Sequence, residues 1–337
     1  MALQLPEIVS LASAYYGSAV LFAALELDLF TQLKRTPHAS ASALAQRLGA
    51  DERGLTLLLN AAVAVGLLTK AEGCFDLTEA AASSLVQGAE HDLTRAIAYN
   101  RGVYSAWGRL AELARTGRPV EAPALHLGED PDRTRTFALS MYGRAMGIGR
   151  AVVPALQLPA GAKVLDLAGG PGAYALLMAQ SAPEITVDTY DLPAISAVAR
   201  ELTASCAGRV RCFAGDYHVD RYPEAAYDAV TLFGCLHQEA PEMIRDILRR
   251  AVGALKPGGR LYVLDMMTGP DHTTPPFSAL FAVNMALTTE HGWVFSTAEL
   301  DGWMAEAGLE ARTFAPVPPP MPHTLTQGRK PACAARA

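Results

Sequence analysis

The sequence predicts an α/β protein with a Rossmann-like domain in its C-terminal half and a helical, winged-helix-like domain before it. Two observations carry this prediction. An apolar run ends in an acid and a glycine cluster, Val-Leu-Asp-Leu-Ala-Gly-Gly-Pro-Gly over 164–172, which is typical of a strand that turns tightly into a helix. From residue 163 onward strands and helices alternate, whereas residues 3–153 show mostly helical patterns.

Composition and charge narrow the class of protein. With 337 residues the chain is long enough for two domains, and its 50% hydrophobic and 18% charged residues are ordinary for a globular protein. The net charge of −6 argues against nucleic-acid or anionic-membrane partners. We expect no membrane span, because no apolar run reaches about 20 residues. We expect no signal peptide, because the N-terminus lacks a charged region followed by an apolar core. The five cysteines are scattered and never spaced as CxxC, so we expect a reduced, cytoplasmic protein.

The N-terminal part is predicted to hold helices over 3–33, 41–48 and 52–65, and a hairpin over 66–78. The order helix, helix, hairpin is that of a winged helix, which would bind DNA through its second helix. That helix carries Arg53 as its one basic residue, beside Glu52. We therefore expect a structural or dimer-forming module rather than a DNA-binding one.

We expect three regions along the chain: a winged-helix-like domain over 1–95, a helical linker over 96–155 and the Rossmann-like domain over 156–337. The helical linker carries aromatic, basic and Met side chains: Arg101, Tyr104, Trp107, Tyr142, Arg144 and Met146. Aromatic and Met residues at helical spacing are most often core residues. The alternative, that these side chains line an apolar pocket for a small molecule, stays open.

The C-terminal half is predicted to form a parallel, doubly wound sheet. Its strands are expected over 163–167, 186–191, 210–214, 229–233 and 260–266, with helices over 174–182, 194–204 and 242–255. Alternating strands and helices imply right-handed crossovers and a parallel sheet. Ligands of such sheets bind at the carboxyl ends of the strands.

Three of these strand ends carry an acid: Asp166, Asp191 and Asp216. A carboxylate at the second strand end can accept both ribose hydroxyls of an adenosine-type cofactor, and Asp216 could accept from an adenine amino group while Tyr217 packs on the ring. Each acid could instead cap a helix or lie in a loop. The stretch 170–175 also fits G-x-G-x-x-A, so a nicotinamide dehydrogenase competes on this motif.

Several motifs in order resemble one family across nearly the whole chain. They are Asp-Leu-Ala-Gly-Gly-Pro-Gly at 166–172, Tyr-Asp-Leu-Pro at 190–193, Gly-Asp-Tyr at 215–217, Leu-His at 236–237 and Leu-Lys-Pro-Gly-Gly at 255–259. The chain resembles the S-adenosylmethionine-dependent small-molecule O-methyltransferases of the plant caffeate and bacterial antibiotic type. The resemblance implies a seven-stranded sheet with a reversed last strand, for which 324–330 is a candidate. It also implies a homodimer interlocked through the N-terminal domains.

The resemblance further assigns the cofactor S-adenosyl-L-methionine to named residues. Ala168, Gly169, Gly170 and Gly172 would hold its methionine part, Asp191 its ribose, and Asp216 with Tyr217 its adenine. The expected cofactor site is completed by Asp166, Leu192 and Phe233. Two positions depart from the family pattern. Ala168 replaces the usual first glycine, and Phe233 stands where many relatives have a lysine near the adenine.

The family resemblance also implies a base for methyl transfer to a hydroxyl of a small aromatic metabolite of secondary metabolism. The family's base lies in Leu-His-Asp-Trp, and here His237 lies in Leu-His-Gln-Glu, so the Asp-Trp is missing. Glu290 or His291 is the expected helper of this base. The alternative is that His237 has only a structural role, as a histidine packed at the end of a strand.

Other functions stay open at this point. In one, His237 and His291 with Glu290 or Glu239 hold a metal for C-methylation of an α-keto acid, whose carboxylate Arg101 or Arg144 would bind. A second is the nicotinamide-dependent oxidoreductase. A third is a non-catalytic ligand-binding or regulatory protein, which the altered His-Gln-Glu stretch favours.

Overall fold

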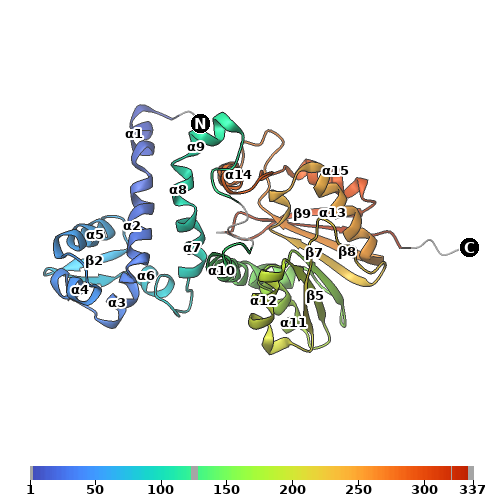
Figure 1. The fold of residues 1–337 in the computed structure, drawn as a ribbon, viewed down its shortest axis with the longest axis horizontal. Coiled ribbons are helices and arrows are strands. Elements are labelled where there is room, and N and C mark those ends of the chain that lie inside the picture. Colours follow the sequence, from blue (N-terminus) through green and yellow to red (C-terminus); the bar gives the residue numbers. More distant parts are fainter. Residues whose placement is uncertain (1–2, 123–127, 320, 333–337) are drawn as a thin grey trace, which may run out of the picture. The chain divides into compact units, whose positions relative to one another are not determined.

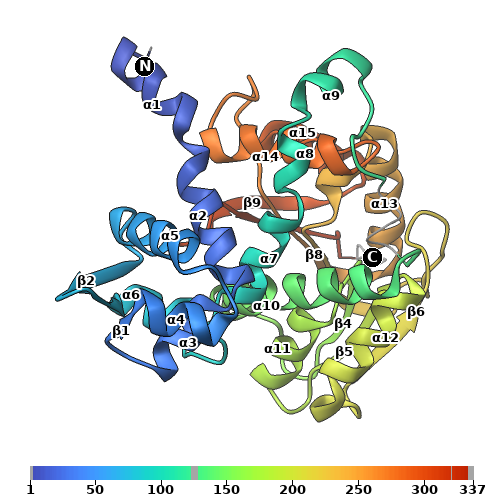
Figure 2. The ribbon, with the colours of Figure 1, turned by 60° about the vertical axis from the view of Figure 1, so that its left-hand side comes forward.

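The computed structural model describes residues 3–122, 128–319 and 321–332, drawn in Figures 1 and 2. The chain divides into two compact units, Met1–Arg101 and Gly102–Ala337. Each unit encloses its own apolar core, as the length and composition predict. The boundary between the compact units lies six residues after the predicted end of the first domain at residue 95.

The N-terminal unit combines helices with a small sheet of order β1-β3-β2. Its helices are α1 Leu5–Ser13, α2 Tyr15–Glu26, α3 Leu29–Arg35, α4 Ala41–Leu48, α5 Glu52–Ala64, α6 Glu79–Ser84 and α7 Thr94–Gly102. Its strands are β1 Ala39–Ser40, β2 Leu68–Ala71 and β3 Cys74–Leu77. The Ser40 hydroxyl and the Asp51 carboxylate cap α4 and α5 by accepting from backbone N–H groups. The predicted order of helix, helix, hairpin is confirmed.

Two features of this unit differ from the prediction. The single helix expected over 3–33 is three helices. Helices α1 and α2 are divided at Ala14, and α3 is separated from α2 because Asp28 adopts a left-handed conformation with φ of 52°. The hairpin also gains a third strand, β1, which pairs antiparallel with β3. A strand of two residues is too short to give a period-2 pattern in the sequence.

The N-terminal helices include one segment that bears on the expectation of no membrane span. Leu5–Glu26 is helical over 22 residues with a hydropathy of 1.7, so by length and composition alone it could cross a membrane. Only 6% of its most apolar window is buried. The side chains that it exposes include Leu5, Ile8, Val9, Leu11, Tyr15 and Tyr16. An exposed apolar surface of this size marks a contact surface.

The C-terminal unit is a seven-stranded sheet covered by helices on both faces. Its helices are α8 Tyr104–Trp107, α9 Leu110–Thr116, α10 Pro131–Ala155, α11 Ala173–Ser181, α12 Pro193–Leu202, α13 Pro241–Ala254, α14 Pro276–Thr288 and α15 Thr297–Glu306. Its strands are β4 Lys163–Leu167, β5 Thr186–Asp191, β6 Val210–Ala214, β7 Tyr227–Phe233, β8 Leu255–Asp265, β9 Glu310–Pro316 and β10 Thr324–Arg329. Short 3₁₀ helices occur at Ala204–Cys206 and Leu236–Gln238.

The sheet has the order β6-β5-β4-β7-β8-β10-β9. Its first five strands pair in parallel, and β10 pairs antiparallel with both β8 and β9. The reversed last strand that the resemblance implies is therefore confirmed at Thr324–Arg329. Strand β9 was not predicted. Its seven residues are mostly exposed and show no apolar run.

Two layers of core flank the sheet. One lies between the sheet and α10 and α11, and the other between the sheet and α13 and α15. Figure 1 shows α11 and α12 on one face and α13 and α15 on the opposite face. This arrangement brings the carboxyl ends of β4, β5, β6, β7 and β8 to one edge, where the predicted site lies.

Candidate active site

The glycine turn joins β4 to α11 through three residues with positive φ: Ala168 at 50°, Gly170 at 57° and Gly172 at 79°. A side chain at Gly169 is excluded by crowding. Its Cβ would lie 2.0 Å from Thr189 Oγ1 and 2.4 Å from Asp166 Oδ2. A Cβ at Gly170 would instead meet nothing within 4 Å, so the turn faces open space there. The backbone is thus exposed to a ligand at Gly170.

Asp166 lies fully buried beneath this turn. Thr231 Oγ1 on β7 donates to Asp166 Oδ1 at 2.6 Å, and Thr189 Oγ1 on β5 approaches Asp166 Oδ2 at 3.4 Å. Both threonines are the direct register partners of Asp166 in the sheet. Burial raises the pKa of this carboxyl to about 7, although the threonine hydroxyls oppose the shift. Asp166 therefore supports the turn from below.

Asp191 connects the glycine turn to the end of β5. Its Oδ2 accepts from the Gly170 N–H and its Oδ1 from the Leu192 N–H, both at 2.8 Å. Burial raises the pKa of Asp191 to about 6, while these two hydrogen bonds favour the ionised form. Each carboxylate oxygen keeps a further lone pair for a ligand hydroxyl.

The loop after β6 holds Asp216 and Tyr217 in a network that includes His218. Asp216 Oδ1 accepts from the His218 N–H at 2.9 Å and lies 2.7 Å from His218 Nδ1. The Tyr217 ring stacks on the His218 ring with 4.5 Å between centroids. The Tyr217 hydroxyl donates to Glu239 and accepts from Gln238 Nε2 at 2.9 Å. The predicted contacts of Asp216 and Tyr217 with adenine stay predictions.

Phe233 ends β7 inside the core. It is 7% exposed and packs edge-on against Tyr174 of α11 at 4.9 Å between ring centroids. Its predicted place beside the adenine rests on the resemblance alone, since burial leaves little of the ring for a ligand.

His237 lies in the 3₁₀ turn after β7 and is paired with an acid. Its Nδ1 lies 2.6 Å from Asp265 Oδ1, at the carboxyl end of β8. An ionised carboxylate only accepts, so Nδ1 of a neutral His237 carries the proton and Nε2 is left as the acceptor. The side chain is 11% exposed, and the Phe281 ring packs edge-on against it at 5.1 Å.

The predicted helpers of His237 are placed differently. Glu290 and His291 are both exposed, and within the described residues neither hydrogen bonds to His237. Residues 3–122, 128–319 and 321–332 hold no group of three or more His, Cys, Asp or Glu side chains that could bind a metal. A metal site built on His237 and His291 therefore has no support among these residues, because no further His, Cys, Asp or Glu side chain completes a ligand group with them.

The predicted pocket residues lie on α7, α8 and α10. The Trp107 indole donates to Asn284 Oδ1 on α14 at 3.0 Å, which ties α8 to the helix that carries Phe281. Tyr104 is 37% exposed. Tyr142 and Met146 lie one turn apart on α10 and are half-buried, and burial raises the pKa of Tyr142. Their contacts with an acceptor stay predictions.

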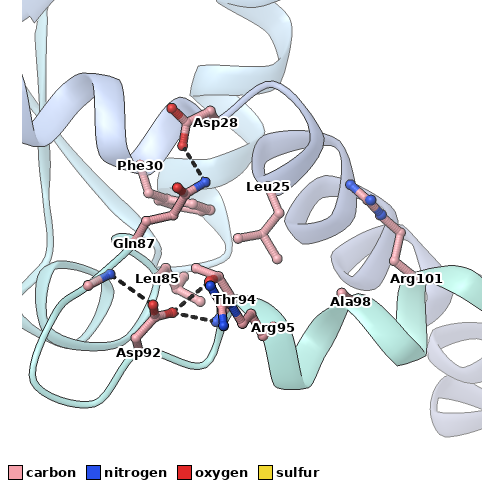
Figure 3. A pocket seen from close by; sticks show the side chains of 11 residues that line it. Leu25, Asp28, Phe30, Leu85, Gln87, Asp92, Thr94, Arg95, Ala98 and Arg101 are labelled. Atoms are coloured by element: carbon pink, nitrogen blue, oxygen red, sulfur yellow. Dashed lines mark hydrogen bonds between the residues drawn. The ribbon is translucent and has the colours of Figure 1, made fainter. Parts of the chain in front are cut away.

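Arg101 lies in the N-terminal unit, where it lines a cavity of about 590 Å³ (Figure 3). Leu25, Phe30, Leu85 and Ala98 supply the apolar part of its wall. Asp92 in this wall is held by the Gly88 N–H and by Thr94, and Asp28 by Gln32 and Gln87. The predicted contact between Arg101 and the carboxylate of an acceptor stays a prediction.

Three site residues were missed in the sequence: His218, Asp265 and His323. Asp265 ends a predicted strand in an acid, which is the pattern that identified Asp166, Asp191 and Asp216. His218 directly follows the Gly-Asp-Tyr motif. His323 precedes β10, and burial lowers its pKa to about 4, with the charge of Asp265 opposing this shift. Asp265 Oδ2 and His323 Nδ1 are buried and have no hydrogen-bond partner among the described residues.

Comparison with known families matches both parts of the chain. Residues 118–310 match the family model of an O-methyltransferase domain, and residues 9–87 match that of an O-methyltransferase dimerisation domain. The first match covers more than half of the chain.

Individual relatives agree with these matches. The chain is 31% identical to the tetracenomycin polyketide synthesis 8-O-methyl transferase TcmO of Streptomyces glaucescens, over 96% of each chain. It is 30% identical to the 3-hydroxy-5-methyl-1-naphthoate 3-O-methyltransferase of Streptomyces sahachiroi, over 91% of this chain and 90% of the relative. The crystal structure of human N-acetylserotonin methyltransferase in complex with S-adenosylmethionine superposes with a TM-score of 0.87 at 25% identity, over 98% of this chain and 99% of that chain.

Proposed function

We propose, since this chain belongs to the O-methyltransferase family, that it methylates a hydroxyl group of a small aromatic metabolite. S-adenosylmethionine is the methyl donor, so the glycine turn belongs to this cofactor and not to a nicotinamide dinucleotide. The two Streptomyces relatives are O-methyltransferases of a polyketide and of a hydroxynaphthoate, which supports an aromatic acceptor. The same relatives support a role in secondary metabolism.

The residues at the strand ends fit the cofactor. Gly170 leaves open space beside a turn whose N–H groups and positive φ values allow a close approach. Asp191 has a lone pair on each oxygen for the ribose hydroxyls, and Asp216 Oδ2 makes no hydrogen bond with any described residue. We assign the methionine part to the turn, the ribose to Asp191 and the adenine to the loop of Asp216.

The observation that carries the catalytic proposal is the 2.6 Å contact between His237 and Asp265. Asp265 orients the imidazole and leaves Nε2 as the acceptor of the substrate's hydroxyl proton. It also stabilises the imidazolium that forms when this proton arrives. General base catalysis of this kind contributes about 10²- to 10⁴-fold to a rate.

The bound cofactor supplies a methyl group on a positively charged sulfur, which leaves as a neutral thioether. The chain's own task is to align the hydroxyl oxygen and remove its proton. His237 Nε2 takes the proton, and Phe281 packs against the imidazole on the side of α14. Asp265 thus replaces Glu290 and His291 as the proposed partner of the base.

We also propose that the active form is a cytoplasmic homodimer. The match of residues 9–87 to a dimerisation domain supports self-association through the N-terminal unit. The exposed apolar side chains of α1 and α2 supply a surface that a second copy can cover, such as Leu5, Val9 and Leu11, which are 76%, 64% and 63% exposed.

Methyl transfer to a panel of phenols and naphthols tests this function. The protein is incubated with S-adenosylmethionine, and products are followed by mass spectrometry together with release of S-adenosylhomocysteine. We expect at least one hydroxylated aromatic to gain a methyl group on oxygen, and its methyl ether analogue to gain none. Methylation that persists on the methyl ether analogue would place the new group on carbon and contradict the proposal.

A further inference from the structure

We propose that His218 is a positioning residue that ties the predicted adenine-binding loop to the turn carrying His237. The loop follows β6 and contains Asp216 and His218. The turn follows β7 and runs from His237 to Glu239. The inference rests on the proposed role of His237 as the base.

His218 bridges two carboxylates from these two segments. Its Nδ1 lies 2.7 Å from Asp216 Oδ1, and its Nε2 lies 3.1 Å from Glu239 Oε2. A neutral imidazole has one N–H donor, whereas an imidazolium has two. Two carboxylate acceptors on opposite ring nitrogens therefore require the protonated ring. In agreement with this, the pKa of His218 is raised to about 9. The hydrogen bond to Glu239 contributes most, Asp216 contributes less, and burial opposes the shift.

Glu239 connects His218 to the turn that carries His237. Its side chain is 8% exposed, so its charge is held inside the protein between His218 and the Tyr217 hydroxyl. The Trp293 indole donates to the Glu239 backbone oxygen at 2.9 Å, and the Trp293 backbone N–H donates to the His237 backbone oxygen at 2.8 Å. The residues on both sides of Gln238 are thus fixed by the same tryptophan.

This network explains how the chain tolerates its departure from Leu-His-Asp-Trp. Glu239 stands in the place of the tryptophan, and its carboxylate holds the turn through polar contacts with the β6 loop. Loss of the His218 charge leaves a buried carboxylate without its cation, which is strongly unfavourable. We expect the turn and the imidazole of His237 to shift when that happens.

Other charged groups near His218 belong to its own loop and to α13. Asp220 Oδ2 accepts from the Asp216 N–H at 2.7 Å. Arg250 of α13 donates to the backbone oxygens of His218 and Asp220, at 3.2 Å and 2.8 Å. Arg250 thus contacts the loop's backbone, and the imidazole itself faces Asp216, Glu239 and the Tyr217 ring.

The test compares wild type with His218→Gln from pH 7 to pH 10. Gln keeps a polar side chain but cannot carry the charge. We expect kcat at saturating substrates to fall about tenfold at pH 7, and the ratio of the two kcat values to approach one at pH 10. The wild-type link is lost as pH rises through about 9, where the imidazolium releases its proton. The ionisation of a phenolic acceptor also moves this ratio toward one, because a phenolate needs no base. The calorimetric comparison below contains no acceptor and is therefore free of that effect.

His38→Gln is the matched control, since His38, just before β1, pairs with Asp76 of β3 at 3.1 Å in the N-terminal unit. Its ratio should stay at one throughout. The proposal would be overturned if wild type and His218→Gln had equal kcat at pH 7, or if kcat of the variant were still tenfold lower at pH 10. If His218→Gln does not fold, Glu239→Gln is measured instead and must show the same pH dependence.

Binding of S-adenosylhomocysteine separates this proposal from that of the base. Calorimetry without acceptor should show affinity about threefold to tenfold weaker in His218→Gln at pH 7 and equal affinities at pH 10. Should His237→Gln keep full turnover, the proposed base is wrong, and this affinity ratio alone then tests the His218 link. Equal affinities at pH 7 would then overturn it.

Discussion

At the scale of single residues, the acids at the strand ends differ in their partners. Asp166 is fully buried between two threonine hydroxyls, Asp191 accepts two backbone N–H groups, and Asp265 faces an imidazole. The same residue type at the same place in a strand thus serves as a support, a proposed ribose acceptor and a proposed helper of a base. Sequence patterns find the acids, and the partners from neighbouring strands decide their chemistry.

Asp166→Asn should remove a pH dependence of stability. The pKa of Asp166 rises from 3.8 to about 7 on folding, so the folded state holds a proton that the unfolded state has released. The stability from this proton is present at acid pH and is lost as pH rises through 7. Between pH 5 and pH 8, wild type should lose about 2–3 kcal/mol more free energy of unfolding than the variant.

Urea unfolding at pH 5, 6, 7 and 8 measures this difference. Asn keeps an oxygen that accepts from the Thr231 hydroxyl but carries no charge. Asp271→Asn is the control, because Asp271 is exposed and hydrogen bonds to Thr273 lower its pKa, out of the range studied. Parallel pH profiles for wild type and Asp166→Asn would contradict the assignment.

Gly169→Ala should weaken cofactor binding at least tenfold. The new Cβ would lie 2.0 Å from Thr189 Oγ1, so the turn must move away from the sheet. Calorimetry with S-adenosylhomocysteine measures the effect. Gly208→Ala is the matched control, since a Cβ there meets nothing within 4 Å and the φ is not positive. Unchanged affinity in Gly169→Ala would show that the turn does not hold the cofactor.

At the scale of elements, the strands β4, β5 and β6 are found at the predicted residues because each is a short run bounded by turn residues or an acid. Strand β9 escapes prediction because an exposed strand next to β10 alone has no buried face along most of its length. The helix break at Asp28 is also not visible in the sequence pattern, because the apolar stripe continues into α3.

The exposed apolar side chains of α1 and α2 form the proposed dimer surface. Ile8→Glu places a charge in the middle of the exposed apolar side chains, and we expect the homodimer to dissociate because a buried unpaired charge is costly. Sedimentation velocity measures the mass. Val219→Glu, at a position that is 72% exposed in the C-terminal unit, should leave the dimer intact.

A wild-type monomer in sedimentation would contradict the dimer proposal. Flotation with phosphatidylcholine vesicles covers the other reading of Leu5–Glu26, which is long and apolar enough to cross a membrane. We expect the wild-type protein to stay at the bottom of the gradient. Co-flotation would assign the apolar helix to a membrane instead of to a second copy.

At the scale of the whole molecule, the fold class, the glycine turn, the three acids and His237 could be predicted from local patterns along the chain. The contacts that give these residues their roles join positions far apart, such as His237 with Asp265 and His218 with Glu239, 28 and 21 residues apart. The first pair depends on β7 and β8 being neighbours in the sheet, and the second joins loops after β6 and β7, which β5 and β4 separate. A single sequence does not contain this strand order. The helper of His237 was therefore sought at Glu290 and His291 instead of at Asp265.

The central claim is that His237 removes the acceptor's proton in an S-adenosylmethionine-dependent methyl transfer. Single-turnover methylation by His237→Gln, with a phenol that wild type accepts, tests it most directly. The account predicts a loss of about 10²- to 10⁴-fold in rate, with the affinity for S-adenosylhomocysteine unchanged in calorimetry. A rate within threefold of wild type, at that same unchanged affinity, would contradict it.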